Sequence, residues 1–283
     1  MASVTLRAFA KINLSLRVHT ARADGFHEVE TILQAIDLAD RVTCKTRRGP
    51  FAILCKAPGV PVDQTNLVWK AAQQLWHAAG RNGEPRDAIV TLEKKIPTQA
   101  GLGGASSDAA AALLGLRRLW KLRIADEDVY GIASALGSDV PYFLIGGTAL
   151  GLGRGERVYP LADLPRLWVA LALPRFGVAT KDAYAWFDAR RGSSGPTPLS
   201  QPLFSHLALV NDLEPPVIER HPVIGQLKER LLQAGALMAA MSGSGSTVFG
   251  VFKSERTART AAAALKRAGV GTTCARFQRR QSP

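Results

Sequence analysis

Apolar and polar residues alternate along the start of the chain in a pattern that predicts β-strands. Residues 4–18 read as a strand, or as a strand with a bend at Ala10-Lys11, and residues 88–94 alternate in the same way. Residues 28–38 form an apolar patterned segment, whereas residues 41–46 and 51–55 are expected to be short strands of a meander. The beginning of the chain is therefore expected to be rich in strands.

A 3.6-residue apolar period predicts the first helices. Residues 66–80 have this spacing, with Gly80 as the stop, and a second buried helical face starts at Ser107. A third helix is expected over residues 126–136, capped by Asp126 or Ala125 and stopped by Gly137. Strand-like pieces follow at residues 141–150 and 157–160.

The second half of the chain reads as a β-α-β-β-α-β pattern, the open-faced sandwich type. A boundary near residues 160–165 divides the chain into a first domain, 1–160, and a second domain, 161–283. Residues 192–202 are rich in Gly, Ser and Pro and are expected to form a loop. The predicted elements are strands at 167–173, 236–241, 247–252 and 272–277, and helices at 222–234 and from the Ser254 cap to Ala268.

A glycine-rich segment, PTQAGLGGASSD at residues 97–108, stands directly before an alanine-rich helix. Glycines let a backbone approach a ligand closely, and a helix N-terminus offers free N–H groups and partial positive charge, so the segment predicts a phosphate cradle. It lacks the Gly-Lys-Ser/Thr of a Walker A loop and the acidic partner of a dinucleotide fingerprint. Tight helix–strand packing is the alternative, but the hydroxyls of Ser106 and Ser107 suit phosphate or metal contacts.

Three further segments contain residues that could take part in binding or catalysis, but none of them indicates a site by itself. Lys11 and Asn13 lie two residues apart on one side of a predicted strand, where a lysine is ordinarily an exposed edge charge. Phe26 and His27 follow a glycine in a loop, which suits base stacking but equally an ordinary turn. Asp139 is placed between a helix and a strand, a common position for a cap or turn former.

A fourth segment, residues 242–246, alternates Ser and Gly between two predicted strands. It is either a flexible turn or a second backbone surface that faces phosphate.

Length, composition and charge limit the classes of protein to which the chain can belong. The chain has 283 residues, 47% of them apolar, and no apolar run long enough to span a bilayer. Its three cysteines suit a reducing cytoplasm and form neither a disulfide framework nor a metal site. The net charge of +13 fits nucleic-acid binding, attraction of a polyanionic small substrate, or simply a basic surface. The basic residues are scattered, without an arm or an aromatic-interleaved stripe, which argues against nucleic acid.

Taken together, these motifs resemble those of the GHMP kinase superfamily, in the same order and over almost the whole chain. Within it, the segments at residues 10–14, 22–27 and 136–141 resemble the members that phosphorylate a cytidine-diphosphate-linked methylerythritol. The resemblance implies an α+β fold of two domains. The N-terminal one would be like domain 2 of ribosomal protein S5, the C-terminal one ferredoxin-like, with nucleotide and substrate meeting in the cleft between them.

The resemblance also implies a reaction: transfer of the ATP γ-phosphoryl group to the 2-hydroxyl of 4-diphosphocytidyl-2-C-methyl-D-erythritol. Asp139 would take the hydroxyl proton, and Lys11 would keep Asp139 ionised and stabilise the attacking oxygen. The residues implied to bind the ATP phosphates are Pro97, Gly101, Leu102, Gly103, Gly104, Ala105, Ser106 and Ser107, with Asn66 and Lys94 or Lys95 near the adenosine. The residues implied to bind the acceptor or to shape its cleft are Asn13, Phe26, His27, Thr180, Tyr184, Gly243 and Gly245.

The chain departs from the family pattern in a few places. Ala105 stands where many relatives have glycine, and Phe26 replaces a frequent tyrosine. No acidic residue matches the magnesium-binding glutamate of other members, so Mg²⁺ is expected to be held by ATP, water and Ser107.

Other functions are considered beside this one. Another small-molecule GHMP kinase, of the homoserine or mevalonate type, is the alternative within the enzymes. An RNA-binding protein would not need Asp139, Lys11 and the glycine loop together. Retention of Lys11 and Asp139 also argues against a relative that has lost catalysis. The expected partners are small molecules, with neither nucleic acid nor membrane, and the expected state is a cytoplasmic monomer or weak homodimer.

Overall fold

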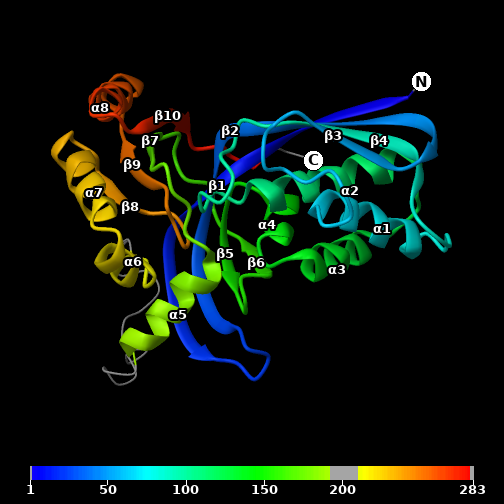
Figure 1. Cartoon of the computed structure of the whole chain (residues 1–283), viewed down its shortest axis with the longest axis horizontal. Coiled ribbons are helices and arrows are strands. Elements are labelled where there is room, and N and C mark those ends of the chain that lie inside the picture. The colour runs from blue at the N-terminus through cyan, green and yellow to red at the C-terminus, as the bar shows by residue number, and fades with distance from the viewer. Residues whose placement is uncertain (1, 192–209, 281–283) are drawn as a thin grey trace.

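The protein folds into two antiparallel-rich sheets with helices packed on them (Figure 1). The computed structural model describes residues 2–191 and 210–280. Helices α1, α2 and α4 lie against the larger sheet, α3 packs on these helices, and α7 and α8 lie beside the smaller sheet (Figure 1). The mixed α+β fold expected from the sequence is confirmed.

The larger sheet has six strands in the order β3-β4-β2-β5-β6, with β1 paired to β2. The predicted pieces at 28–38 and 41–46 are one continuous strand, in which Asp40 is buried and accepts hydrogen bonds from the N–H groups of Lys95 and Ile96. The strands are β1 (Ser3–Ala21), β2 (His27–Pro50), β3 (Ala52–Cys55), β4 (Arg86–Glu93), β5 (Thr148–Leu152) and β6 (Arg157–Pro160).

The pairing of β1 with β2 shifts register three times, between Phe9 and Ala10, between Asn13 and Ser15, and between Val18 and Ala21. The first shift coincides with the bend predicted at Ala10-Lys11. Lys11 and Asn13 lie between the first two irregularities. Bulges bend a strand and re-aim its side chains, so this short stretch is where β1 turns two polar groups into the interior.

The helices of the first half begin and end near the predicted residues, with two exceptions. The Asn66 side chain, at the predicted start of the helix, caps α1 by accepting from the Val68 N–H. However, α2 starts at Gly104, so the paired serines lie inside its first turn rather than before it. Residues 140–145 are helical, not a strand, because Pro141 sits in the first turn and starts a helix well. The helices are α1 (Leu67–Ala78), α2 (Gly104–Leu119), α3 (Asp126–Leu136) and α4 (Val140–Ile145).

The smaller sheet has the order β10-β7-β9-β8, and each neighbouring pair is antiparallel. With α7 and α8 it makes the predicted β-α-β-β-α-β sandwich. Two helices, α5 and α6, were not predicted, and the loop expected at 192–202 lies outside the described residues. The elements are β7 (Trp168–Leu173), α5 (Thr180–Arg191), α6 (Glu214–Arg220), α7 (Val223–Gln233), β8 (Met238–Met241), β9 (Val248–Phe252), α8 (Glu255–Arg267) and β10 (Gly271–Arg276).

The β1–β2 hairpin contributes to the cores of both sheets. Its middle part, with Ile12 and Ile36, packs against Leu171 and Phe249 of the smaller sheet. Nearer its tip, Leu16 joins the cluster under α6 and α7. The hairpin thus ties the two halves of the chain together, and the division at residue 160 stays a prediction. None of the helices in the described ranges is long and apolar enough to cross a membrane.

Candidate active site

A cavity of about 1260 Å³ lies where the glycine-rich segment, the β1–β2 hairpin and α5 meet. Asn66, Lys94 and the start of α2 line it, and so do Phe26 and Tyr184. Lys11 and Asp139 line the same cavity. The structure therefore gathers into one cavity most of the residues singled out from the sequence, although they come from segments more than 200 residues apart.

Lys11 is buried at the wall of this cavity, and its ammonium is held in place by a chain of hydrogen bonds. Its Nζ donates to Asn13 Oδ1 at 2.7 Å. The Asn13 amide nitrogen donates in turn to Thr31 Oγ1, whose hydroxyl donates to the Ser15 carbonyl. Because the Thr31 hydroxyl is committed to that carbonyl, Asn13 must present its oxygen to Lys11. This arrangement fixes the position of the lysine charge.

Asp139 faces the Lys11 ammonium, with Oδ2 3.5 Å from Nζ. It occupies the N-cap position of α4, but its side chain makes no capping hydrogen bond. The carboxylate, whose side chain is 39% exposed, is therefore available to the cavity, unlike a structural cap. The capping role considered from the sequence is not what this side chain does. A carboxylate beside a fixed ammonium can take a proton from a hydroxyl placed between them.

Two glycine-containing loops interlock next to this pair. The Ser242 hydroxyl donates to the Gly101 carbonyl at 2.9 Å, and the Thr247 N–H donates to the Ala100 carbonyl. Gly101 has a φ of +74°, and a Cβ there would lie 2.2 Å from the Ser242 carbonyl oxygen. A Cβ on Gly243 would lie 3.2 Å from Asn13 Oδ1 and 3.4 Å from Lys11 Nζ. Both loops thus need glycine to approach each other and the lysine this closely.

Lys94 lines the cavity near the start of α2, where it is held by two buried carboxylates. Its Nζ pairs with Asp40 Oδ2 and, at 2.5 Å, with Asp108 Oδ2. The other Asp40 oxygen accepts from the N–H groups of Lys95 and Ile96, which ties the segment before the glycine loop to β2. Burial raises the pKa of Asp108 to about 7, and the Asp40 charge adds to this while Lys94 opposes it. Its Oδ1 is buried without a hydrogen-bond partner.

Three aromatic side chains that line the cavity are Phe26, His27 and Tyr184. The rings of His27 and Tyr184 stack at a centroid distance of 5.2 Å, and His27 Nε2 lies 2.8 Å from Asp188 Oδ1. Burial raises the pKa of Tyr184 to about 12, with the Asp139 charge adding to the shift. Tyr184 therefore stays a neutral hydrogen-bonding phenol. The Phe26 ring is 51% exposed, so one of its faces is free for a ligand.

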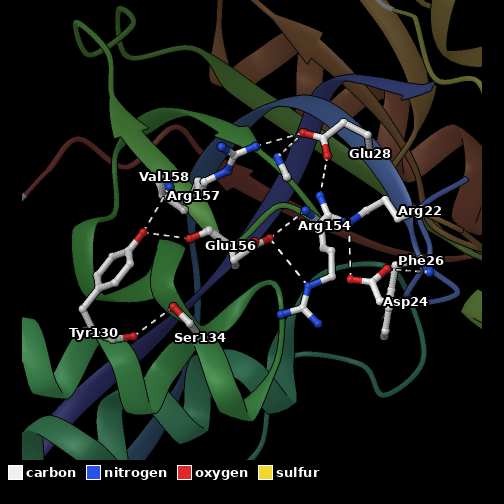
Figure 2. A network of polar contacts seen from close by, with 11 residues as sticks. Arg22, Asp24, Phe26, Glu28, Tyr130, Ser134, Arg154, Glu156, Arg157 and Val158 are labelled. Atoms are coloured by element: carbon white, nitrogen blue, oxygen red, sulfur yellow. Dashed lines mark hydrogen bonds and ion pairs between the residues drawn. The ribbon is translucent and has the colours of Figure 1, made fainter. Parts of the chain in front are cut away.

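The loop that carries Phe26 is braced by charged groups (Figure 2). Arg22 pairs with Asp24 and Glu28, and the Asp24 carboxylate accepts from the Phe26 N–H. The Arg154 guanidinium lies 5.0 Å from the Phe26 ring centroid, in a cation–π contact. The loop is therefore not a free turn, because its ends and its aromatic ring are fixed.

The structure brings all but two of the predicted site residues to the cavity. Ser107 is not a lining residue, because its hydroxyl points into the protein and donates to the Phe9 carbonyl at 2.7 Å. The magnesium contact expected of it is corrected accordingly. Lys95 does not line the cavity either, whereas Lys94 does. The residues found there are Lys11, Asn13, Phe26, His27, Asn66, Lys94, Pro97, Gly101, Leu102, Gly103, Gly104, Ala105, Ser106, Asp139, Thr180, Tyr184, Gly243 and Gly245.

Several residues of the site were missed from the sequence. Arg154, Asp188 and Asp108 line the cavity, and Asn211 supports it by donating to the carbonyls of Met241 and Gly243. Asp108 is the last residue of the predicted phosphate segment and Arg154 stands between two glycines, so these two carried a local signal. Asp188 and Asn211 carried none, because only tertiary packing of α5 and α6 brings them here.

Comparisons with known proteins agree with this geometry. Residues 66–147 match the GHMP kinases N terminal domain, and residues 196–271 match the GHMP kinases C terminal domain. A 4-diphosphocytidyl-2-C-methyl-D-erythritol kinase of Synechococcus sp. (strain JA-3-3Ab) is 43% identical over 276 residues, which cover 92% of this chain and 88% of that one. The chain belongs to the GHMP kinase family. This kinase is therefore expected to use ATP, in keeping with its family.

Solved structures resemble this GHMP kinase over almost its whole length. A crystal structure of a 4-(cytidine 5'-diphospho)-2C-methyl-D-erythritol kinase has a TM-score of 0.81 and 34% identity, covering 97% of this chain and 99% of that one. A homoserine kinase from Cytophaga hutchinsonii has a TM-score of 0.71 at 22% identity, covering 100% and 96% of the two chains. The second likeness concerns the fold alone. The α+β fold and the kinase class predicted from the sequence are thus confirmed.

Proposed function

We propose that this GHMP kinase transfers the γ-phosphoryl group of ATP to the 2-hydroxyl of 4-diphosphocytidyl-2-C-methyl-D-erythritol, a step of isoprenoid precursor synthesis by the methylerythritol phosphate route. The observation that carries the proposal is the Lys11–Asp139 pair at 3.5 Å, in the same cavity as the glycine-rich start of α2 and the Phe26–His27 loop. The relatives that match the chain almost end to end have names that specify the same cytidyl acceptor.

In this proposal the Asp139 carboxylate accepts the proton of the acceptor hydroxyl as its oxygen attacks the γ-phosphorus. The Lys11 ammonium stabilises the negative charge that builds up on that oxygen, and Asn13 holds the ammonium in position. Phosphoryl transfer needs mainly alignment and charge neutralisation, so few residues suffice. The N–H groups at the start of α2 would hold the triphosphate, with Ser106 beside them.

Nucleotide and acceptor occupy opposite parts of the cavity in this proposal. Asn66 and Lys94 contact the adenosine side, and Phe26, His27, Thr180 and Tyr184 contact the cytidine side. Magnesium would accompany ATP and neutralise phosphate charge. The described residues include no cluster of three or more His, Cys, Asp or Glu side chains able to hold a metal, and Ser107 does not line the cavity. No residue of this chain is therefore assigned to the ion.

An acceptor panel tests the proposal. ADP formation is measured with ATP and, separately, the cytidyl methylerythritol, mevalonate and homoserine. The proposal expects turnover with the cytidyl substrate and little with the other two. Preferential turnover of mevalonate or homoserine would instead assign the chain to one of the other acceptor classes of the family.

A further inference from the structure

The histidine of the acceptor side is held by an acidic residue from a different element. His27 begins β2 and is 8% exposed, and its Nε2 lies 2.8 Å from Oδ1 of Asp188 on α5. Tyr184, one helical turn earlier on α5, stacks on the same ring at 5.2 Å. Phe187 meets the ring edge-on at 6.2 Å. Helix α5 therefore fixes both the position and the orientation of this imidazole.

The contact with Asp188 also decides which ring nitrogen carries the proton. An ionised carboxylate only accepts hydrogen bonds, so the His27 nitrogen that faces it must be the protonated one. In the neutral imidazole the other nitrogen, Nδ1, is then an acceptor. Among the residues described, none forms a hydrogen bond with Nδ1, and His27 lines the cavity. The ring thus has an unused acceptor in the part of the cavity assigned to the nucleobase.

We propose that Asp188 is a positioning residue that makes the acceptor side of this site prefer cytosine to uracil. The inference rests on the proposed function, because it concerns the base of the cytidyl acceptor. Cytosine has an amino group where uracil has a carbonyl oxygen. An acceptor nitrogen on His27 can receive a hydrogen bond from that amino group, whereas it faces a second acceptor in uracil.

Removal of the Asp188 carboxylate is expected to abolish this preference for cytosine while the His27 ring stays in the cavity. With Asp188 replaced by alanine, the imidazole can move its proton to Nδ1 and donate to the uracil oxygen. The variant is therefore expected to gain relative activity toward uridine compounds as it loses activity toward cytidine compounds. Because the Asp188 side chain is 52% exposed, water competes for its hydrogen bond with His27. We therefore expect the preference for cytidine over uridine compounds to change by about tenfold, which is less than the discrimination reached by sites closed to water.

The test compares the wild-type kinase with Asp188→Ala, using the cytidyl and the uridyl forms of the diphospho-methylerythritol acceptor. The ratio of the two kcat/KM values is expected to fall by about tenfold in the variant, through the acceptor KM, while the KM for ATP changes by less than about twofold. Asp188→Glu, which restores a carboxylate, is expected to recover part of the preference. Asp182→Ala is the matched control, since it removes a charge from the same helix at a residue that does not line the cavity.

Calorimetric affinities for CDP and UDP, measured without ATP, keep the inference separate from the proposed function. Absence of turnover with either acceptor in the wild type would overturn the proposed function, and the CDP-to-UDP affinity ratio would still decide the role of Asp188. An unchanged ratio in a folded Asp188→Ala protein, or an equal change in Asp182→Ala, overturns the inference. A lowered ratio in Asp188→Ala alone supports it.

Discussion

The Lys11 ammonium lies 3.5 Å from the Asp139 carboxylate, although the two residues come from the first strand and from the turn between α3 and α4. Lys11 is also bonded to Asn13, so its charge is shared between a fixed amide oxygen and the carboxylate. This geometry makes the amide oxygen a positioning group and leaves the carboxylate free to accept a proton. A prediction about Asn13 follows directly.

Replacement of Asn13 by alanine is expected to lower kcat more than it changes the KM for ATP, because it frees the Lys11 side chain without touching the nucleotide side. A loss of about tenfold in kcat is reasonable for a residue that acts through another one. Asn13→Asp, which keeps an oxygen near Lys11, serves as the partner variant and is expected to retain more activity. Steady-state kinetics with both substrates varied make the measurement. Equal kcat values for wild type and Asn13→Ala would contradict this role.

Gly101 is expected to tolerate no side chain. Its φ of +74° and the 2.2 Å approach of a Cβ to the Ser242 carbonyl mean that Gly101→Ala must push the two loops apart. We expect the KM for ATP to rise at least about tenfold, since the phosphate-binding backbone moves. Gly80→Ala is the control: its φ is +72°, but nothing lies within 4 Å of the added Cβ, so it tests backbone strain alone. A similar KM for ATP in both variants would argue against the close approach as the cause.

Phe26 is expected to contribute to acceptor binding and not to ATP binding. Phe26→Ala removes the exposed ring face and the contact with Arg154, which we expect to weaken acceptor binding by about 1–3 kcal/mol, as for other base-stacking aromatics. Phe26→Tyr keeps the ring and should bind the acceptor nearly as well as the wild type. Equilibrium titration with the cytidyl acceptor measures both. A loss confined to ATP affinity would show that Phe26 lies on the wrong side of the cavity for this role.

Asp108 makes stability depend on pH. Its pKa is raised from an ordinary value near 4 to about 7, so between these values the folded protein holds a proton that the unfolded chain has released. The stabilisation present at low pH is therefore lost as pH rises toward 7, by at most about 1.4 kcal/mol per pH unit. In the Asp108→Asn variant, the part of this change in the free energy of unfolding with pH that Asp108 causes should vanish.

Urea unfolding of the ligand-free protein between pH 5 and 8 measures that slope. Asp128→Asn, at an exposed position of α3, is the control and should leave the slope as it is in the wild type. Identical slopes in the wild type and Asp108→Asn would show that Asp108 is ionised throughout this range.

Much of the fold and of the site was predictable from the sequence, because local signals and motifs coincide. The helix predicted over residues 66–80 and the β-α-β-β-α-β order both followed from apolar periodicity and the glycine stops. The continuity of β2 through Asp40 was not predicted, because the contacts that hold this buried carboxylate, with Lys94, Lys95 and Ile96, come from a segment far along the chain. The start of α2 was misplaced because three small residues before Ser107 carry no helical period.

Contacts between distant elements could not be predicted. Ser107 was expected to face a ligand, yet its hydroxyl bonds to Phe9 on a strand nearly a hundred residues away. The contact of Asp188 with His27 depends on α5. This helix was not predicted, because its many charged residues obscure the apolar period. Residue type thus indicated which groups have the right chemistry, and only the packing decides which way they point.

The most direct test of the central claim is a ³¹P NMR time course of the wild type and Asp139→Asn with ATP, magnesium and the cytidyl methylerythritol. The wild type is expected to form ADP and a new phosphomonoester on the 2-hydroxyl in equal amounts. Asp139→Asn, which keeps the shape but cannot accept the proton, should form it about 10³-fold more slowly while still binding ATP. Phosphorylation at another position, or near-normal product formation by Asp139→Asn, would contradict the account.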